Sequence, residues 1–270
     1  MICKDIIRKI EEVYPKEAAL GFDNVGLLVG RSGREVRRVF LALDATDEVI
    51  HAAKAFQADM LITHHPLIFS PMKSITDSDF IGRRVIEIIH HDISYYAMHT
   101  NYDVMRMAKL SSDILGLTDT DVLDPTREFD GKEEGIGRIG KVPETMTVRE
   151  CCEYVKEKLN LEAVKVFGSL EKEVNILAVS PGSGKSAIKP ALCKGADVLV
   201  TGDIGHHEGI DAAEQGLAVI DAGHYGTEYI FMEDMKAFLH KELPLLVTDF
   251  VCGMTDSYAK RLYQELKGIL

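Results

Sequence analysis

The sequence lacks any long apolar run. Of its 270 residues, 46% are apolar, but no stretch approaches the roughly 20 consecutive apolar residues that a membrane span needs. Residues 1–17 carry charges throughout and so differ from a secretory signal with its apolar centre. We therefore expect a soluble globular protein in the cytoplasm, with no membrane association.

An excess of basic residues is also missing. Lys and Arg number 31 against 43 Asp and Glu, which gives a net charge of −12. This balance argues against broad attraction to a phosphate backbone, so nucleic acid is an unlikely partner. The most basic segment, residues 31–38, is short and interrupted by Glu35, which favours a solvated turn.

Paired cysteines are absent as well. The five cysteines are an odd count and show no CxxC or similar metal-binding spacing: Cys3, Cys151, Cys152, Cys193 and Cys252. Reduced thiols are therefore the default expectation. The adjacent pair, Cys151 and Cys152, lies in a predicted helix over 147–159 and receives no functional role.

What the sequence does contain is an alternation of apolar runs with segments of helical periodicity, which predicts an α/β fold. Helices are expected over 46–57, with Thr46 as N-cap, and over 79–92 and 227–243. The predicted strands are 38–44, 59–65, 94–100, 173–182, 197–203 and 217–223.

The two halves resemble one another. Residues 58–63 (ADMLIT) and 196–201 (ADVLVT) are nearly the same phrase, and each precedes a His-His pair. In each half a later strand ends in a histidine followed four residues on by an acid. This pattern predicts two related α/β lobes whose strand ends converge on a shared cleft.

The boundary between the lobes is expected in the polar, glycine-rich stretch 123–142. The expected lobes are therefore residues 1–125 and 126–270, with the C-terminal segment able to pack back on the first lobe.

Histidines gather at the predicted strand ends, where ligands bind in open α/β sheets. One histidine there is more often structural, but two adjacent pairs and two acid-coupled residues favour a metal site. Imidazole and carboxylate ligands without thiolate suit a borderline divalent ion in an open centre. The histidines concerned are His64, His65, His99, His206, His207 and His224.

Spacing adds detail to this metal prediction. His224 and Glu228 are four residues apart at the start of a helix, where both can face one ion. His64 and His65 leave a strand side by side and point in different directions, which indicates two ions. The loop 180–186 (SPGSGKS) is not a complete phosphate-binding motif, because Val179 replaces its first glycine, but it could offer Lys185 and backbone amides to an anion.

Five motifs together resemble the Nif-three-like family, whose members are often labelled GTP cyclohydrolase I type 2 homologues. These are FDNVGLLVG (22–30), LITHHPLIF (61–69), HTNYD (99–103), TGDIGHHEGIDAAEQG (201–216) and DAGHYGTE (221–228). Tyr102 stands where the family usually shows leucine, a change expected to alter packing more than ligation. The resemblance implies a dinuclear metal centre between two lobes and a ring-like homohexamer built from trimers.

The resemblance also implies a ligand set. His64 and Asp103 would hold one divalent ion, His65 and His224 the other, and Glu228 would bridge both. Zinc, iron, manganese and cobalt all suit these ligands.

Two functions fit these residues. The first is a metal-dependent hydrolase acting on a small anionic or nucleotide-like substrate, with His99, His207 and Asp203 moving protons or orienting the metal ligands. The alternative is a non-enzymatic metal-binding or scaffold ring protein with a regulatory role.

Overall fold

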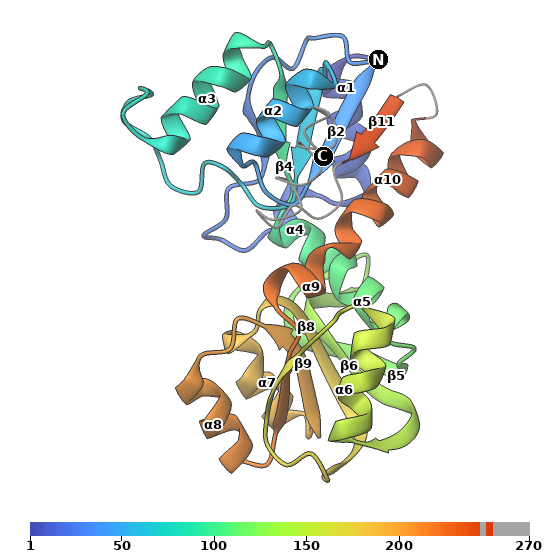
Figure 1. The fold of residues 1–270 in the computed structure, drawn as a ribbon. Helices are drawn as coiled ribbons and strands as arrows, with labels where there is room; N and C mark the ends of the chain where they lie inside the picture. Colours follow the sequence, from blue (N-terminus) through green and yellow to red (C-terminus); the bar gives the residue numbers. More distant parts are fainter. Residues whose placement is uncertain (244–246, 251–270) are drawn as a thin grey trace. The chain divides into compact units, whose positions relative to one another are not determined.

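The computed structural model describes residues 1–243 and 247–250, which belong to two compact units (Figure 1). Unit 1 comprises residues 1–102 and the segment from Phe231 onward, and unit 2 comprises residues 103–230. The chain thus enters unit 2 at Asp103, well before the expected boundary near residue 125. Within the described ranges, no helix has the length and apolar content to cross a membrane.

Unit 1 is built on a five-stranded sheet in the order β1-β4-β3-β2-β11. The pairs β4-β3, β3-β2 and β2-β11 are parallel, and β1 runs antiparallel to β4. The strands are β1 (Gly26–Val29), β2 (Arg38–Ala42), β3 (Met60–Thr63), β4 (Ser94–Ala97) and β11 (Val247–Phe250). The predicted strands over 38–44, 59–65 and 94–100 are confirmed, whereas β1 and β11 were missed.

Helices cover both faces of this sheet, as the alternation of side chains along a strand requires. On one face Tyr95 packs in a core with residues of α2 (Asp47–Ala55) and α3 (Phe80–His90). Its neighbour Tyr96 points to the other face, where its hydroxyl contacts Glu11 of α1 (Cys3–Val13). Three elements complete the unit: η1 (Lys16–Ala18), α4 (Thr100–Tyr102) and α10 (Ile230–Glu242). The short helix α9 (His224–Glu228), which precedes α10 in the chain, belongs to unit 2.

Side-chain caps fix where the predicted helices begin. The Thr46 hydroxyl accepts a hydrogen bond from the Val49 amide at the start of α2, and Asp79 does the same for Gly82 in α3. Each bond satisfies a backbone donor that the first helical turn leaves unpaired. The helix predictions over 46–57 and 79–92 are confirmed.

Unit 2 contains a six-stranded sheet in the order β5-β6-β8-β9-β10-β7. Its centre, β8-β9-β10, is parallel, while β7 pairs antiparallel with β10 and β6 with β8. The strands are β5 (Thr118–Phe129), β6 (Lys132–Thr147), β7 (Lys165–Phe167), β8 (Glu173–Ser183), β9 (Val198–Gly202) and β10 (Ala218–Asp221). The three predicted strands of this half are the parallel ones.

Separate apolar cores flank the unit 2 sheet. One includes Cys151 and Cys152 of α6 (Val148–Lys158), and the other includes Ala191 of α7 (Ile188–Cys193) and Ala212 of α8 (His206–Glu214). Burial raises the pKa of Cys151 to about 12, which keeps it a neutral core thiol. The remaining helices are η2 (Asp103–Met107), α5 (Ala108–Ile114) and η3 (Lys185–Ala187). Cys252 lies outside the described residues.

The stretch 123–142, expected to link the lobes, is instead the greater part of a long hairpin formed by β5 and β6. Asp130 and Gly131 connect the strands with φ angles of 50° and 73°. An Asp-Gly pair with both residues at positive φ is a favoured two-residue hairpin turn. The polar residues that suggested a linker lie in the outer part of this hairpin, where β5 and β6 pair with each other and the pairing of β6 with β8, which begins at Arg138, has not yet started.

The internal duplication is visible in the topology. In unit 1 the parallel strands β4, β3 and β2 lie side by side in that order, and antiparallel β1 pairs with β4. In unit 2 the parallel strands β10, β9 and β8 have the same arrangement, and antiparallel β7 pairs with β10. The repeated phrase supplies β3 and β9. Its aspartate has the same role in both: Asp59 accepts from the amides of Arg37 and Arg38, and Asp197 from those of Asn175 and Ile176.

Candidate metal centre

Three predicted site histidines lie together in unit 1. His64 and His65 follow β3, and His99 follows the neighbouring parallel strand β4. The carboxyl ends of adjacent parallel strands meet at one edge of a sheet, which brings these side chains together. One ring nitrogen from each lies within 4.8 Å of those of the other two, a spacing at which a metal ion can be held.

Each of these imidazoles is oriented through its Nδ1 atom. His64 Nδ1 lies 2.9 Å from the carbonyl oxygen of Met98, and His65 Nδ1 lies 2.9 Å from Asp44 Oδ1. His99 Nδ1 lies 3.0 Å from Asp23 Oδ1. An imidazole that donates from Nδ1 presents the lone pair of Nε2, the usual arrangement of histidine ligands and their supporting acceptors.

Sequence reasoning missed both supporting aspartates. Asp44 ends the predicted strand 38–44 beside the strand that carries His65, so its place at the same sheet edge was a usable signal. For Asp23 the sequence contains no such signal except its place in the FDNVGLLVG motif, because Asp23 contacts His99 from a loop 76 residues away in sequence.

Asp23 is the more tightly held of the two. Its side chain is fully buried and also accepts from the Thr100 amide (2.9 Å) and hydroxyl (2.6 Å). Burial alone would favour the neutral acid, but the hydrogen bonds from His99 and Thr100 outweigh it and lower the pKa of Asp23 to about 2. The aspartate is therefore ionised and fixes both His99 and the first turn after β4.

Unit 2 contributes a histidine and a glutamate on a single helical turn. His224 and Glu228 begin and end α9, which follows β10, as the spacing of four predicted. His224 Nε2 lies 3.1 Å from Glu228 Oε2, and Glu228 is 3% exposed. Two ligands about 2.1 Å from one ion at the tetrahedral angle are about 3.4 Å apart, so this pair has the separation of two ligands of one ion.

Asp203 orients His224 in the way that Asp44 orients His65. Its Oδ2 lies 2.7 Å from His224 Nδ1, and its backbone adopts a φ of 55° directly after β9. The residue predicted to assist catalysis therefore contacts a predicted ligand. His206 and His207 are exposed in the first turn of α8, and for His207 a catalytic role stays a prediction.

Asp103 begins the π-helical turn η2 at the point where the chain enters unit 2. Its neighbour Tyr102, the departure from the family motif, is fully buried in unit 1 and donates a hydrogen bond to Asp234 (2.7 Å). The Tyr102 ring also packs on Phe231, with centroids 4.9 Å apart. Tyr102 thus has a packing role in unit 1, and its small effect on ligation stays a prediction.

The segment 180–186, which comprises the end of β8 and the start of η3, supports Glu228. The Gly182 amide donates to Thr227, and a Cβ on Gly182, whose φ is 74°, would meet Glu228 Oε1 at 2.2 Å. Glycine is therefore needed at this position for the end of β8 to lie against the glutamate. Lys185, considered as an anion ligand, forms an ion pair with Glu208 instead.

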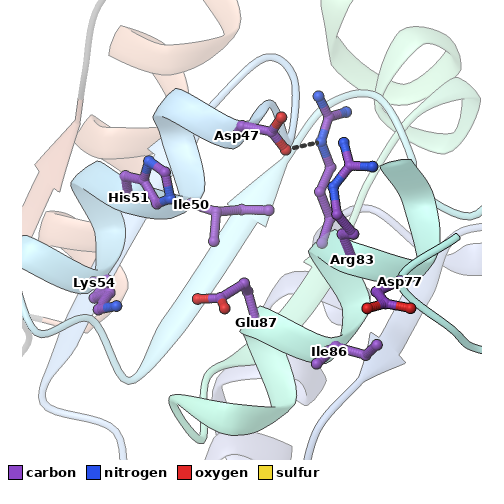
Figure 2. A pocket seen from close by; sticks show the side chains of 9 residues that line it. Asp47, Ile50, His51, Lys54, Asp77, Arg83, Ile86 and Glu87 are labelled. Carbon is purple, nitrogen blue, oxygen red and sulfur yellow. Dashed lines mark hydrogen bonds and ion pairs between the residues drawn. The ribbon is translucent and has the colours of Figure 1, made fainter. Parts of the chain in front are cut away.

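A hollow of 580 Å³ lies between α2 and α3 of unit 1 (Figure 2). Its permanent charges balance, with three acids and three basic residues among the lining, and one acid, Asp47, is paired with Arg84 at 2.7 Å. It contains none of the predicted metal ligands. The lining residues are Asp47, Ile50, His51, Lys54, Asp77, Arg83, Arg84, Ile86 and Glu87.

The histidine motifs and the fold agree with a known family. The model of the Duf34/NIF3 family (NGG1p interacting factor 3) matches residues 1–256. The chain belongs to this family. A relative from Clostridium perfringens, called a GTP cyclohydrolase 1 type 2 homolog, is 34% identical over 254 residues, covering 92% of this chain and 96% of the relative.

Solved structures of family members share the fold. A NIF3-related protein from Bacillus cereus superposes with a TM-score of 0.85 at 26% identity and covers 94% of this chain and 98% of its own. Reduced HcgD from Methanocaldococcus jannaschii gives a TM-score of 0.81 at 33% identity, with 94% and 98% covered. These matches confirm the predicted family and its α/β fold.

Proposed function

We propose that the chain binds two divalent metal ions and is a hydrolase of a small anionic, nucleotide-like substrate. In this proposal His64 and Asp103 hold one ion, His65 and His224 hold the other, and Glu228 bridges them. The observation that carries it is the shared orientation of the histidines: Nδ1 of His64, His65 and His224 is held by a carbonyl or carboxylate, which turns Nε2 outward as the ligand atom.

The donor set fits a borderline divalent ion. Three imidazoles and two carboxylates without thiolate are suited to zinc, iron, manganese or cobalt in an open site. The support comes separately from each unit: unit 1 brings His64 and His65 together after β3, and unit 2 holds His224 and Glu228 at ligand separation.

Divalent ions in such a site lower the pKa of bound water and polarise phosphoryl or carbonyl oxygens. The chain's own residues orient the site. Asp44 and Asp203 fix the imidazole planes of His65 and His224, while Asp23 holds His99 beside His64 and His65. In this scheme His99 and His207 carry protons to or from the substrate.

A non-enzymatic metal-binding or scaffold role is the second candidate. The observation in its favour is that the hollow between α2 and α3 includes none of the predicted ligands. A molecule bound in that hollow would therefore not contact the predicted metal ligands. Turnover of phosphoester and purine substrates by the wild type and by His65→Ala separates the two. Metal-dependent turnover lost in the variant supports the hydrolase, and metal binding without turnover supports the scaffold.

The first experiment measures metal content. Protein purified without a histidine tag is analysed by plasma mass spectrometry beside Glu228→Ala and a control, Glu208→Ala, whose carboxylate pairs with Lys185 on the surface. We expect about two ions per chain in the wild type and the control, and joint loss of both in Glu228→Ala. Substoichiometric metal that the Glu228 variant leaves unchanged would contradict the ligand assignment.

The proposal extends to assembly and location. We expect a trimer-based homohexameric ring in the cytoplasm, as the family resemblance implies. Sedimentation equilibrium of the full chain measures this directly, and a monomeric mass at micromolar concentration would contradict it.

A further inference from the structure

Two phenylalanines in the loops that carry Asp23 and His65 are exposed to solvent. Phe22 is 62% exposed, the highest value for any large apolar side chain in the described part, and Phe69 is 49% exposed. Their ring centroids lie 6.1 Å apart at an interplanar angle of 43°. The two rings thus form one small exposed aromatic surface, contributed by segments 47 residues apart in sequence.

The loops that carry these rings are held firmly. Asn24 Nδ2 donates to the Ile68 carbonyl (2.6 Å), which ties the two loops together beside the rings. The Leu67 amide donates to the Tyr95 hydroxyl (2.8 Å), and Tyr95 is fully buried. Both loops are therefore tied to the rest of unit 1 by side-chain hydrogen bonds.

The same loops also position the histidine cluster. Asp23, the residue after Phe22, contacts His99 through its carboxylate. Phe69 follows His65 by four residues, so their Cα atoms are at most about 14 Å apart. Phe22 is thus one residue from the aspartate that orients His99, and Phe69 is four residues from His65.

We propose that Phe22 and Phe69 form a stacking platform for a planar ring of the small-molecule ligand whose anionic part binds at the proposed metal centre. This inference rests on the proposed function and specifies its substrate class as heteroaromatic, as in a nucleotide. Phenyl rings carry no hydrogen-bond donor or acceptor, so the platform recognises a π-face and accepts different bases.

The size of the surface favours a small ligand. A phenylalanine buries about 200 Å² when fully covered, so these half-exposed rings offer about 200 Å² together. A stable protein interface needs about 800 Å² on each side. One planar heterocycle, by contrast, is large enough to stack on one of these rings and to contact the other, which is tilted by 43°.

The absence of tryptophan from the chain makes a direct test possible. Phe69→Trp and, separately, Phe22→Trp each introduce a single tryptophan, whose fluorescence is followed in zinc-loaded protein during titration with GMP or with ribose 5-phosphate. We expect GMP to quench the tryptophan and ribose 5-phosphate to leave it unchanged. Equal responses to the two probes, or none to either, would overturn the platform.

Calorimetry tests the same idea without the reporter. We expect the wild type to bind GMP about tenfold more tightly than ribose 5-phosphate, and Phe22→Ala and Phe69→Ala to remove that preference. Ile89→Ala is the control, since Ile89 is 56% exposed in the last turn of α3. AMP should behave like GMP; strict selectivity for one purine would contradict stacking as the source of affinity.

Parallel measurements separate this inference from the proposed function. Two zinc ions per chain without a preference for GMP over ribose 5-phosphate would support the metal centre and contradict the stacking platform. Failure to bind metal would remove both. A change of sedimenting mass in Phe22→Ala or Phe69→Ala would instead identify the rings as a subunit contact and overturn the stacking role.

Discussion

The repeated phrase ADMLIT/ADVLVT gives the same strand in the two units, but the residues after it behave differently. After β3 the chain continues with His64, fully buried, and His65, which contacts Asp44. In unit 2 the phrase is followed by Gly202, the last residue of β9, and by Asp203, which contacts His224 at the start of α9. In unit 1 this position supplies candidate ligands, and in unit 2 it supplies the support for one.

The difference shows how a duplicated framework can carry unlike chemistry. Parallel strands of equal order bring their carboxyl ends to one edge in both units, and that edge is where side chains can meet. Which residue becomes a ligand then depends on single positions at the strand ends. The His-His pair of the second half, His206 and His207, lies four residues farther on and falls on helix α8.

We expect the largest effect on stability from a substitution of Gly202, the residue that follows the repeated phrase in unit 2. A Cβ on Gly202 would lie 2.6 Å from the His224 amide nitrogen and 2.9 Å from the Gly182 carbonyl oxygen, which are backbone atoms that cannot turn aside. We expect Gly202→Ala to lower the free energy of unfolding by about 3 kcal/mol and to reduce metal content. Urea denaturation measures the first effect.

Gly33→Ala is the control for this substitution, because nothing lies within 4 Å of its Cβ position. A Gly202→Ala protein as stable as this control would show that the close approach behind His224 is not a constraint.

We expect the next largest effect at Asp23, the aspartate that orients His99 in unit 1. Because the pKa of Asp23 is about 2 in the folded protein against 3.8 ordinarily, its ionised form stabilises the fold above pH 4, and this is lost as the pH falls towards 2. We expect Asp23→Asn to cost about 2 kcal/mol at pH 7 and little near pH 2. Urea denaturation across this range tests it; a cost independent of pH would contradict the ionised assignment.

The equivalent aspartates at the start of β3 and β9 sharpen the comparison further. Asp59 and Asp197 each accept hydrogen bonds from two backbone amides. Asp59 also pairs with Arg34 at 2.7 Å, whereas the ion pair of Asp197 with Lys172 is longer, at 3.8 Å. Burial opposes ionisation, yet the bonds from Arg37, Arg34 and Arg38 lower the pKa of Asp59, so its contribution is present at neutral pH and lost in acid.

We therefore expect Asp59→Asn to destabilise the protein by about 1 kcal/mol more than Asp197→Asn, measured by urea denaturation at pH 7. The excess should shrink as the pH falls below 4. Equal costs at both pH values would mean that Arg34 adds nothing to the shared backbone role.

The smallest effect is expected at His207, which is exposed on α8. His207→Ala should change the free energy of unfolding by less than about 0.5 kcal/mol and leave metal content at the wild-type value, whereas His224→Ala should lose part of the metal. Loss of turnover in His207→Ala with metal retained would support its proposed role in proton transfer. Loss of metal in that variant would make it a ligand and break the contrast between the two His-His pairs.

Local sequence signals were sufficient for the central elements of both units. Short buried strands and amphipathic helices with side-chain caps carry their periodicity in neighbouring residues, so β2, β3, β4, β8, β9 and β10 were all predicted with errors of a few residues. The linker prediction for 123–142 is wrong because the polar residues there belong to the outer part of the β5-β6 hairpin, whose turn is formed by Asp130 and Gly131.

The sequence by itself determined the repeated strand phrase, the histidines at strand ends and the family, because each is a pattern of adjacent residues. Only the tertiary structure decided that Asp23, Asp44 and Asp203 orient His99, His65 and His224, and that Lys185 pairs with Glu208. These contacts join residues 21 to 76 positions apart. Strand order and loop packing determine which of these residues meet, and no local sequence pattern encodes either of them.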